Sequence, residues 1–296
     1  MSLPIVCAGH PRDMGFAQGH ALREIIRVEV ARAGLLTHRS LWPSLRPVVS
    51  GALRGRGPGR ELFRHFAHQA ERLEGLAQAA ALPLDSLVEL QLRLKLGAGA
   101  GGELGKETAW IVRESRPVVG FRSLELTLPW LVSAVAGVNE AGLAVLAQGP
   151  QVAESGELPR RDGDAPPILL VQDCLARFEN LAGALDWCRK RPVEGQQTIV
   201  LGDTSGARAT VEICGRERRV ELVPGAGPAG DRAAVGIEGS LGGAMATATA
   251  ASGAGDFVRI DLTARSLDLS GVAAFARKSG QTFGFERLAA SPAKTK

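Results

Sequence analysis

The spacing of apolar residues divides the chain into a helical part and a part made of short strands. Between residues 11 and 36, apolar side chains such as Met14 and Ala17 recur every three to four positions, which predicts one amphipathic helix. The same spacing predicts a second helix over 60–82 and a third over 84–96, directly after Pro83. The glycine- and proline-rich stretch between the first two predicts a linker or long loop.

From residue 108 onward the apolar runs become short and β-branched. Turn residues separate them, as is typical of antiparallel strands. The predicted strands cover 108–113, 117–126, 130–138 and 142–149. Between the last two, Asn139-Glu140-Ala141-Gly142 has the composition of a tight hairpin turn.

Helices and strands then alternate once more. Two helices are predicted over 166–178 and 180–192, the second with Asn180 as its cap. A hairpin over 197–213 and a strand over 218–223 follow. This order predicts a layered protein in which helices pack on a sheet. The Gly- and Ala-rich tail carries only weak strand signals before a strand region over 258–270 and a last helix over 271–278.

Composition narrows the class of protein. A chain of 296 residues with 45% hydrophobic and 22% charged residues is expected to fold as a globular protein. The 35 basic residues barely exceed the 31 acidic ones, so we expect no nucleic-acid partner. No basic segment leads into an apolar run at the N-terminus, and no apolar run reaches about 18 residues. We therefore expect no membrane partner and a cytoplasmic protein of bacterial type.

The candidate metal ligands and thiols do not form a recognisable site. The four cysteines have no Cys-x-x-Cys spacing, so neither a disulfide framework nor a zinc site is indicated. His65 and His68 lie three apart on a predicted helix, a spacing that a metal could use, but the sequence offers no third ligand beside them. No metal and no cofactor are expected.

Several segments together resemble the penicillin acyltransferase-like family, the relatives of acyl-coenzyme A:6-aminopenicillanic acid acyltransferase. In "AGHPRDMGFAQGHALREII", Gly9, Pro11, Gly15, Gly19 and His20 fit the family's N-terminal pattern. The segments "GVNEAGLAV", "PPILLVQDCLARFENLAGALDW" and "TIVLGDTSGARATVEI" resemble its later landmarks in the same order. The resemblance covers roughly residues 5–223.

This resemblance implies an α+β fold of the N-terminal nucleophile hydrolase class, a four-layer αββα sandwich preceded by a helical pro-segment. The pro-segment is expected over 1–102 and the sandwich domain over 103–296, with a degenerate part from about residue 225 onward. Members of the family act on amide bonds. Their precursor cleaves itself before a Cys, Ser or Thr, whose freed α-amino group then serves as the base for its own side chain.

The sequence departs from the family at the nucleophile. The matching run is Gly105-Lys106-Glu107-Thr108, which places either Lys106 or Glu107 where the cysteine is expected. Neither side chain supports autocleavage, because attack on the preceding carbonyl needs a thiol or a hydroxyl. Thr108 is the alternative nucleophile. Its use would require the strand to slip in register, and a slip of one residue reverses the face to which a side chain points.

Other residues of the site are retained in part. By resemblance, Arg122 would lie beside the nucleophile and Glu125 would replace the family's acidic partner; the plainer alternative is a surface salt bridge between the two. Asn139 matches a position that helps form the oxyanion hole in related cholylglycine-type hydrolases, or it simply serves the turn. The family's later Asn-His-Phe-like and Ser-Arg elements have no counterpart after Val223.

The sequence therefore predicts a catalytically degenerate, uncleaved member of this family that binds an acyl, amide or peptide ligand. The alternative is an active acyltransferase or amide hydrolase that uses Thr108 after autocleavage. A third interpretation is a purely structural or interaction module. The sequence leaves the ligand and the oligomeric state open.

Overall fold

The computed structural model describes residues 4–35, 59–94, 110–149, 164–223, 236–240, 257–261, 264–268 and 282–284. None of the helices in these ranges has the length and apolar character that crossing a membrane requires. The predicted linker before residue 59, the junction at 97–102 and the last helix over 271–278 lie outside the described residues.

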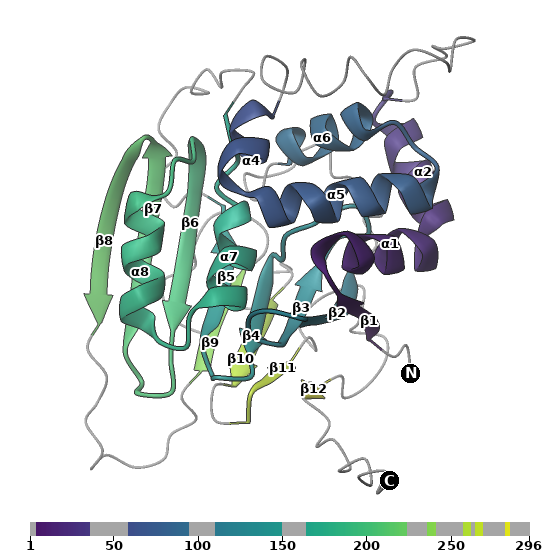
Figure 1. The fold of residues 1–296 in the computed structure, drawn as a ribbon. Coiled ribbons are helices and arrows are strands. Elements are labelled where there is room, and N and C mark those ends of the chain that lie inside the picture. Colours follow the sequence, from purple (N-terminus) through teal and green to yellow (C-terminus); the bar gives the residue numbers. More distant parts are fainter. Residues whose placement is uncertain are drawn as a thin grey trace, which may run out of the picture.

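An eight-stranded sheet forms the centre of the molecule (Figure 1). Its strands lie side by side in chain order, and all neighbours are antiparallel except the parallel first pair. The strands are β1 (Ile5–Gly9), β2 (Ile111–Pro117), β3 (Ser123–Thr127), β4 (Ala136–Asn139), β5 (Ala144–Gln148), β6 (Gly195–Gly202), β7 (Arg208–Gly215) and β8 (Glu217–Val223).

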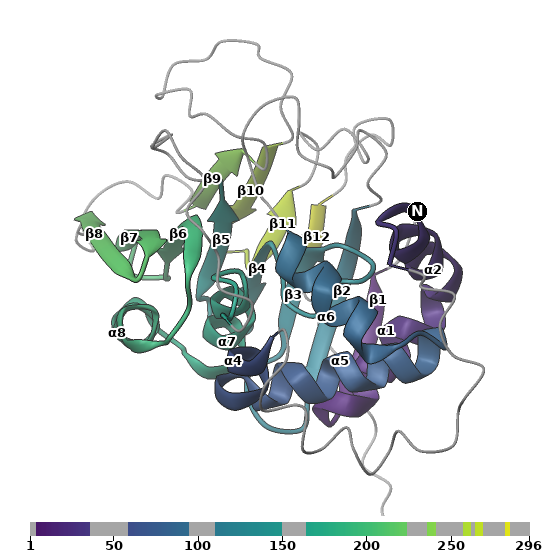
Figure 2. The ribbon, with the colours of Figure 1, turned by 90° about the horizontal axis from the view of Figure 1, so that it is seen from above.

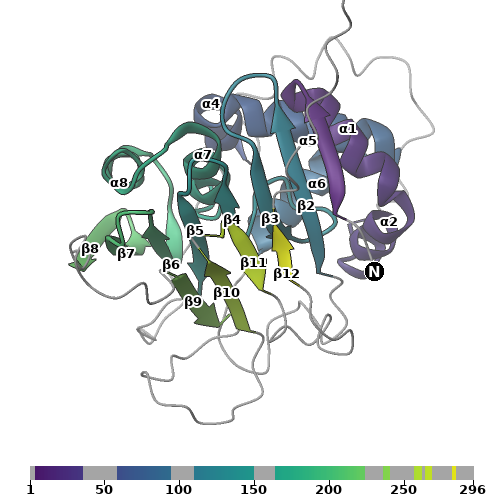
Figure 3. The ribbon, with the colours of Figure 1, turned by 90° about the horizontal axis from the view of Figure 1, so that it is seen from below.

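A helical layer covers one face of this sheet and a smaller sheet lies against the other (Figures 2 and 3). The helices are α1 (Pro11–Ala21), α2 (Arg23–Arg32), α4 (Arg60–His65), α5 (Ala67–Ala80), α6 (Leu84–Arg93), α7 (Leu169–Arg177) and α8 (Leu181–Lys190). The smaller, antiparallel sheet consists of β9 (Gly236–Ser240), β10 (Phe257–Asp261), β11 (Ser266–Asp268) and β12 (Thr282–Gly284), in the order β12-β11-β10-β9. It packs over β3 to β6.

The mixed α+β class is therefore confirmed, with a large and mostly antiparallel sheet. The described residues form a helical layer and two sheets. The second helical layer of the expected αββα sandwich stays a prediction, as do the domain boundary at 102 and the pro-segment. The N-terminal part contributes more than helices, because β1 pairs in parallel with β2 at the edge of the central sheet. This strand was not predicted from the sequence.

The long helices predicted in the N-terminal part are each interrupted once. The first breaks at Leu22 and the second at Phe66, where the backbone leaves the helical region. After the break at Leu22, Ile26 and Val30 are buried, while Val28 is exposed although it also belongs to the apolar spacing of this segment. The predictions of one continuous helix over 11–36 and another over 60–82 are therefore wrong, because each segment forms two helices. The third predicted helix is confirmed as α6.

The strand predictions place most of the later elements correctly. The Asn139–Gly142 turn is confirmed, and so is the hairpin that turns at Asp203–Gly206. Asn180 caps α8, because its side chain accepts a hydrogen bond from the Gly183 N–H at 3.1 Å. The strand predicted over 130–138 is shorter than expected, since β4 begins only at Ala136.

Glycines let α1 and α5 pack in close contact. A Cβ atom on Gly15 would lie 1.8 Å from the Arg72 carbonyl oxygen, and one on Gly75 would lie 1.9 Å from the Arg12 carbonyl oxygen. A Cβ atom on Gly19 would meet the Leu76 carbonyl oxygen at 2.6 Å. Two of the glycines in the N-terminal pattern, Gly15 and Gly19, therefore serve helix packing, which needs no catalytic role.

Candidate functional site

The expected nucleophile position lies outside the described part of the chain. Lys106, Glu107 and Thr108 are not among the described residues, which resume at Trp110, one residue before β2. The roles assigned to these three residues therefore stay predictions.

Immediately beyond that position, a charged cluster is buried between the central sheet and the helices. Arg113 of β2 and Glu125 of β3 are directly opposite each other across the two strands. The Arg113 Nε lies 2.5 Å from the Glu125 Oε2, and both side chains are fully buried. The alternative of a surface salt bridge between Arg122 and Glu125 is wrong, because Glu125 is buried and pairs with Arg113.

Four donors surround the Glu125 carboxylate. Its Oε2 accepts from the Arg113 Nε and, at 3.0 Å, from the Ser115 hydroxyl. Its Oε1 accepts from the Ser123 hydroxyl at 2.5 Å and from the Gln172 Nε2 at 2.8 Å. Each oxygen thus has two protein donors, a number that satisfies a buried carboxylate.

The Arg113 guanidinium uses every nitrogen for contacts inside the protein. Its Nη1 donates to the Gln18 side chain at 2.7 Å, and its Nη2 donates to the Gln172 side chain at 2.9 Å. The two Nη atoms also donate to backbone carbonyl oxygens of the segment that leads into β4, at residues 131–133. Because Gln18 belongs to α1 and Gln172 to α7, the pair ties both helices to the sheet.

A second buried arginine borders the cluster and is poorly partnered. Arg72 of α5 has both Nη atoms 3.3 Å from the Ser115 hydroxyl, and its Nε has no hydrogen-bond partner. Burial lowers the pKa of Arg72 to about 10, and the nearby charge of Arg113 adds to this effect. The contact with Cys7 and the charge of Glu125 act in the opposite direction. Arg72 therefore remains a cation at neutral pH.

Opposing effects set the protonation of Glu125. Burial raises its pKa, but the charges of Arg113 and Arg72 and the hydrogen bonds from Ser123 and Gln172 lower it more. The net pKa of Glu125 is below the ordinary value for a glutamate. The group is therefore a carboxylate at neutral pH and cannot act as a general acid there.

Arg122 lies outside this cluster and pairs with another acid. It forms an ion pair with Glu114 and also contacts Glu140, whose side chain accepts from the Arg122 backbone N–H at 3.0 Å. Burial raises the pKa of Glu114, but hydrogen bonds and charges from Arg116 and Arg122 outweigh it and lower that pKa. The expected role of Arg122 beside a nucleophile stays a prediction.

Asn139 is fully buried at the end of β4. Its Nδ2 donates to the carbonyl oxygens of Leu175 and Phe178, at 3.0 and 2.7 Å. Its Oδ1 accepts from the backbone N–H groups of Gly142 and Leu143. Both amide protons are thus donated within the fold, and the side chain joins the hairpin turn to the end of α7. Its oxyanion-hole role stays a prediction.

The two histidines considered as metal ligands each lie beside a carboxylate. The His65 Nε2 lies 2.9 Å from Glu61, and the His68 Nε2 lies 2.7 Å from the buried Asp173. In the described ranges, no group of three or more His, Cys, Asp or Glu side chains could hold a metal ion.

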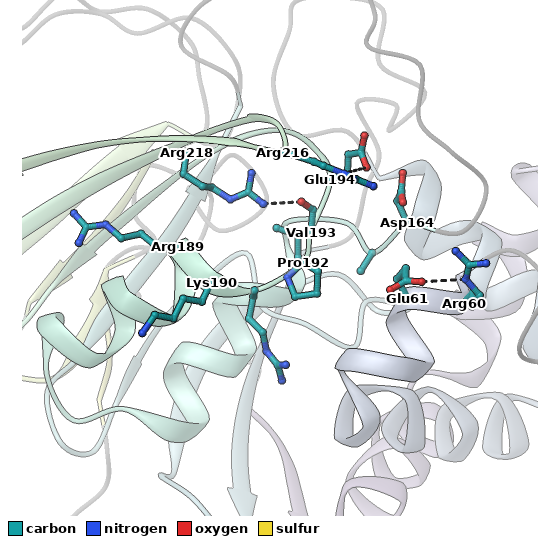
Figure 4. A pocket seen from close by; sticks show the side chains of 12 residues that line it. Arg60, Glu61, Asp164, Arg189, Lys190, Pro192, Val193, Glu194, Arg216 and Arg218 are labelled. Atoms are coloured by element: carbon teal, nitrogen blue, oxygen red, sulfur yellow. Dashed lines mark hydrogen bonds and ion pairs between the residues drawn. The ribbon is translucent and has the colours of Figure 1, made fainter.

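A pocket of about 470 Å³ opens beside the helical layer (Figure 4). It lies between α4, the segment that joins α8 to β6, and the turn between β7 and β8. Six cationic side chains and three carboxylates line it. On opposite walls, Arg60 pairs with Glu61 at 3.0 Å and Arg216 pairs with Glu194 at 3.2 Å. Among the described residues, those expected for the site from the sequence, Arg122, Glu125 and Asn139, do not line this pocket.

Comparison with known proteins yields weak structural similarity only. No family model and no curated protein matches the chain. Among solved structures, a penicillin V acylase from Agrobacterium tumefaciens aligns with 23% identity, a TM-score of 0.28, and 45% of this chain against 43% of its own. Two variants of the conjugated bile acid hydrolase from Clostridium perfringens align with 16% identity, a TM-score of 0.28, and 35% of this chain against 36% of theirs. This chain thus spans less than half of each, and no residue role is taken from them.

Proposed function

We propose that this chain is a catalytically degenerate penicillin acyltransferase-like protein that stays uncleaved and binds a small acyl, amide or peptide ligand. Its sequence retains the ordered landmarks of that family from Gly9 to the hairpin over 197–213. The observation that carries the proposal is the environment of Glu125, the residue that by resemblance replaces the family's acidic partner. Its carboxylate is sealed from solvent and held by four protein donors. Such a group stabilises the fold and has no free lone pair for a substrate.

Asn139 supports the same proposal. Stabilisation of an oxyanion requires a donor that points at the reacting oxygen, whereas both Asn139 amide protons point at carbonyl oxygens of α7 and the residue after it. The expected nucleophile position adds a chemical argument. Autocleavage begins with an N-to-S or N-to-O acyl shift, in which a thiol or hydroxyl attacks the preceding peptide carbonyl. The lysine amine at 106 and the glutamate carboxylate at 107 cannot perform this step.

Intact mass spectrometry of the freshly purified chain tests the loss of processing. We expect one species at 31.0 kDa. Two fragments that meet at Thr108 and together account for the chain plus one water would overturn the proposal. In that case a Thr108→Ala variant should remain whole, which would assign the cleavage to the threonine hydroxyl. Turnover of penicillin-type amides, conjugated bile acids or short N-acyl peptides by the uncleaved protein would overturn it as well.

The charged pocket is the proposed ligand site. Its cationic side chains outnumber its carboxylates two to one, which favours a ligand with a free carboxylate, such as an N-acyl amino acid or a peptide. Titration calorimetry with an N-acetyl dipeptide tests this. Arg60→Gln and Arg216→Gln, on opposite walls, should each weaken binding, while Arg32→Gln on the distant α2 should not. If peptides and acyl amino acids produce no heat of binding, the proposed ligand binding is overturned. The proposal that the chain stays uncleaved is tested separately by the mass measurement.

A further inference from the structure

Two buried cysteines from different helices lie side by side. The Cys174 Sγ of α7 and the Cys188 Sγ of α8 are 3.6 Å apart. Both residues are fully buried, and both thiols are free. This pair cannot be recognised from the sequence, because the two residues are separated by a turn between helices and lack the Cys-x-x-Cys spacing.

The surroundings hold the two sulfur atoms in place. The Cys174 Sγ also lies 3.8 Å from the Ala184 carbonyl oxygen, one helical turn before Cys188 on α8. Beside them, the Trp187 indole N–H donates to the Asp173 carboxylate at 3.0 Å, which is a second link between α8 and α7. The two helices are thus fixed relative to each other at the position of the thiols.

We propose that Cys174 and Cys188 form a reversible disulfide that joins α7 to α8 when the protein meets a low-molecular-weight disulfide oxidant. A disulfide needs sulfur atoms about 2.05 Å apart, so the pair has to close by only about 1.5 Å, within the reach of a small helix shift or a side-chain rotation. This inference does not depend on the proposed function.

The reaction is a thiol–disulfide exchange in two steps. One cysteine, as thiolate, attacks the oxidant's disulfide, so that one S–S bond breaks, a mixed disulfide forms and one small thiol leaves. The second cysteine then attacks the protein sulfur of that mixed disulfide and releases the second small thiol. The two protein thiols lose two protons and two electrons, which the two released thiols carry away.

Burial of the two cysteines limits when the thiol–disulfide exchange can occur. Hydrogen bonding to Cys188 and burial raise the pKa of the Cys174 thiol, so this thiol stays protonated at neutral pH. The oxidant can therefore reach the two thiols only when α8 moves away from α7. Once formed, the bond closes a loop of about 15 residues and restricts the unfolded chain.

Thiol counting in glutathione redox buffers tests the proposal. The chain has four cysteines, and after equilibration with excess oxidised glutathione, titration in denaturant should find two free thiols and peptide mapping should join Cys174 to Cys188. The thermal midpoint should rise by about 5 °C over the reduced protein. Reduction with dithiothreitol should restore four thiols.

Variants that each lack one cysteine test which two cysteines form the disulfide. Cys188→Ala and Cys174→Ala should each keep all three remaining thiols in the oxidising buffer, while Cys214→Ser, on β7, should fall from three to one. The proposal is overturned by four free thiols in the oxidised wild type, by stable glutathione adducts in place of the internal bond, or by loss of two thiols in either alanine variant.

Discussion

At the residue scale, the buried cluster contains two guanidinium groups and one carboxylate. Arg113 is fully hydrogen-bonded and faces Glu125, whereas Arg72 makes long contacts to Ser115, contacts the Cys7 thiol and has an unpartnered Nε. A buried charge is tolerated when it is paired and hydrogen-bonded, and is costly otherwise. The two arginines are therefore expected to contribute very unequally to stability.

The matched substitutions Arg113→Met and Arg72→Met test this expectation. Arg113→Met leaves the Glu125 carboxylate buried without its cation and should lower the free energy of unfolding by about 3 to 5 kcal/mol. Arg72→Met removes a poorly compensated charge and keeps the side-chain volume, so the change should stay within about 1 kcal/mol. Urea unfolding at pH 7 measures both. An equal loss in the two variants would contradict this account of the cluster.

The sequence singles out only one member of this cluster, Glu125, because it falls in a recognisable motif. Its partners Arg113 and Gln172 do not, and neither does Gln18, which contacts Arg113. Each of the three is a polar residue in a helix or strand that also carries apolar residues. That local signal marks a buried polar group, but it cannot say which of several distant segments supplies the partner. The contact between Gln18 and Arg113 joins residues 95 positions apart in the sequence.

At the scale of elements, the packing of α1 on α5 depends on glycines at the crossing. We expect Gly15→Ala and Gly75→Ala each to lower the free energy of unfolding by about 3 kcal/mol or more, because the new Cβ atom meets a backbone carbonyl that no side-chain rotation can move. Chemical denaturation measures the loss. Phe16→Ala, next to Gly15 but on the exposed side of α1, is the control and should change stability by about 0.5 kcal/mol or less. Wild-type stability in both glycine variants would show that the helices can separate at little cost.

The cap of α8 gives a smaller, local prediction. Asn180→Ala removes the acceptor for the Gly183 N–H and should cost about 1 kcal/mol, whereas Asn180→Ser should retain most of the stability. Thermal unfolding of the two variants measures the difference. Equal midpoints for alanine and serine would mean that the side chain makes no useful cap.

The spacing of apolar residues located the helices and strands more accurately than it located their first and last residues. Both helix interruptions, at Leu22 and Phe66, occur at apolar residues that carry no breaking signal, because tertiary packing redirects the chain there. Strand β1 was missed since five residues next to a helix start give too short a pattern. Turn chemistry was more reliable, because Asn139–Gly142 and Asp203–Gly206 have local reasons to turn.

At the scale of the whole molecule, the N-terminal part is built into the central sheet. Strand β1 and helices α1 and α5 contact β2 and the buried cluster through hydrogen bonds. If the chain were cut between residues 95 and 109, β1 would still be held at the sheet edge by these contacts. Separation of two fragments in solution therefore requires denaturant, and intact mass under denaturing conditions is the appropriate measurement of processing.

The buried carboxylate also predicts how global stability depends on pH. Because the pKa of Glu125 is lower in the folded protein than in the unfolded chain, its contribution is present above the unfolded value of about 4.3 and is lost as pH falls through the folded value. Glu114 acts in the same direction. We expect the free energy of unfolding to fall on acidification below about pH 5, and Glu125→Gln to be less stable at pH 7 with a flatter acid dependence that retains the Glu114 part. Urea titrations from pH 7 to pH 3 measure this; parallel curves for wild type and Glu125→Gln would mean that Glu125 does not carry its charge into the folded core.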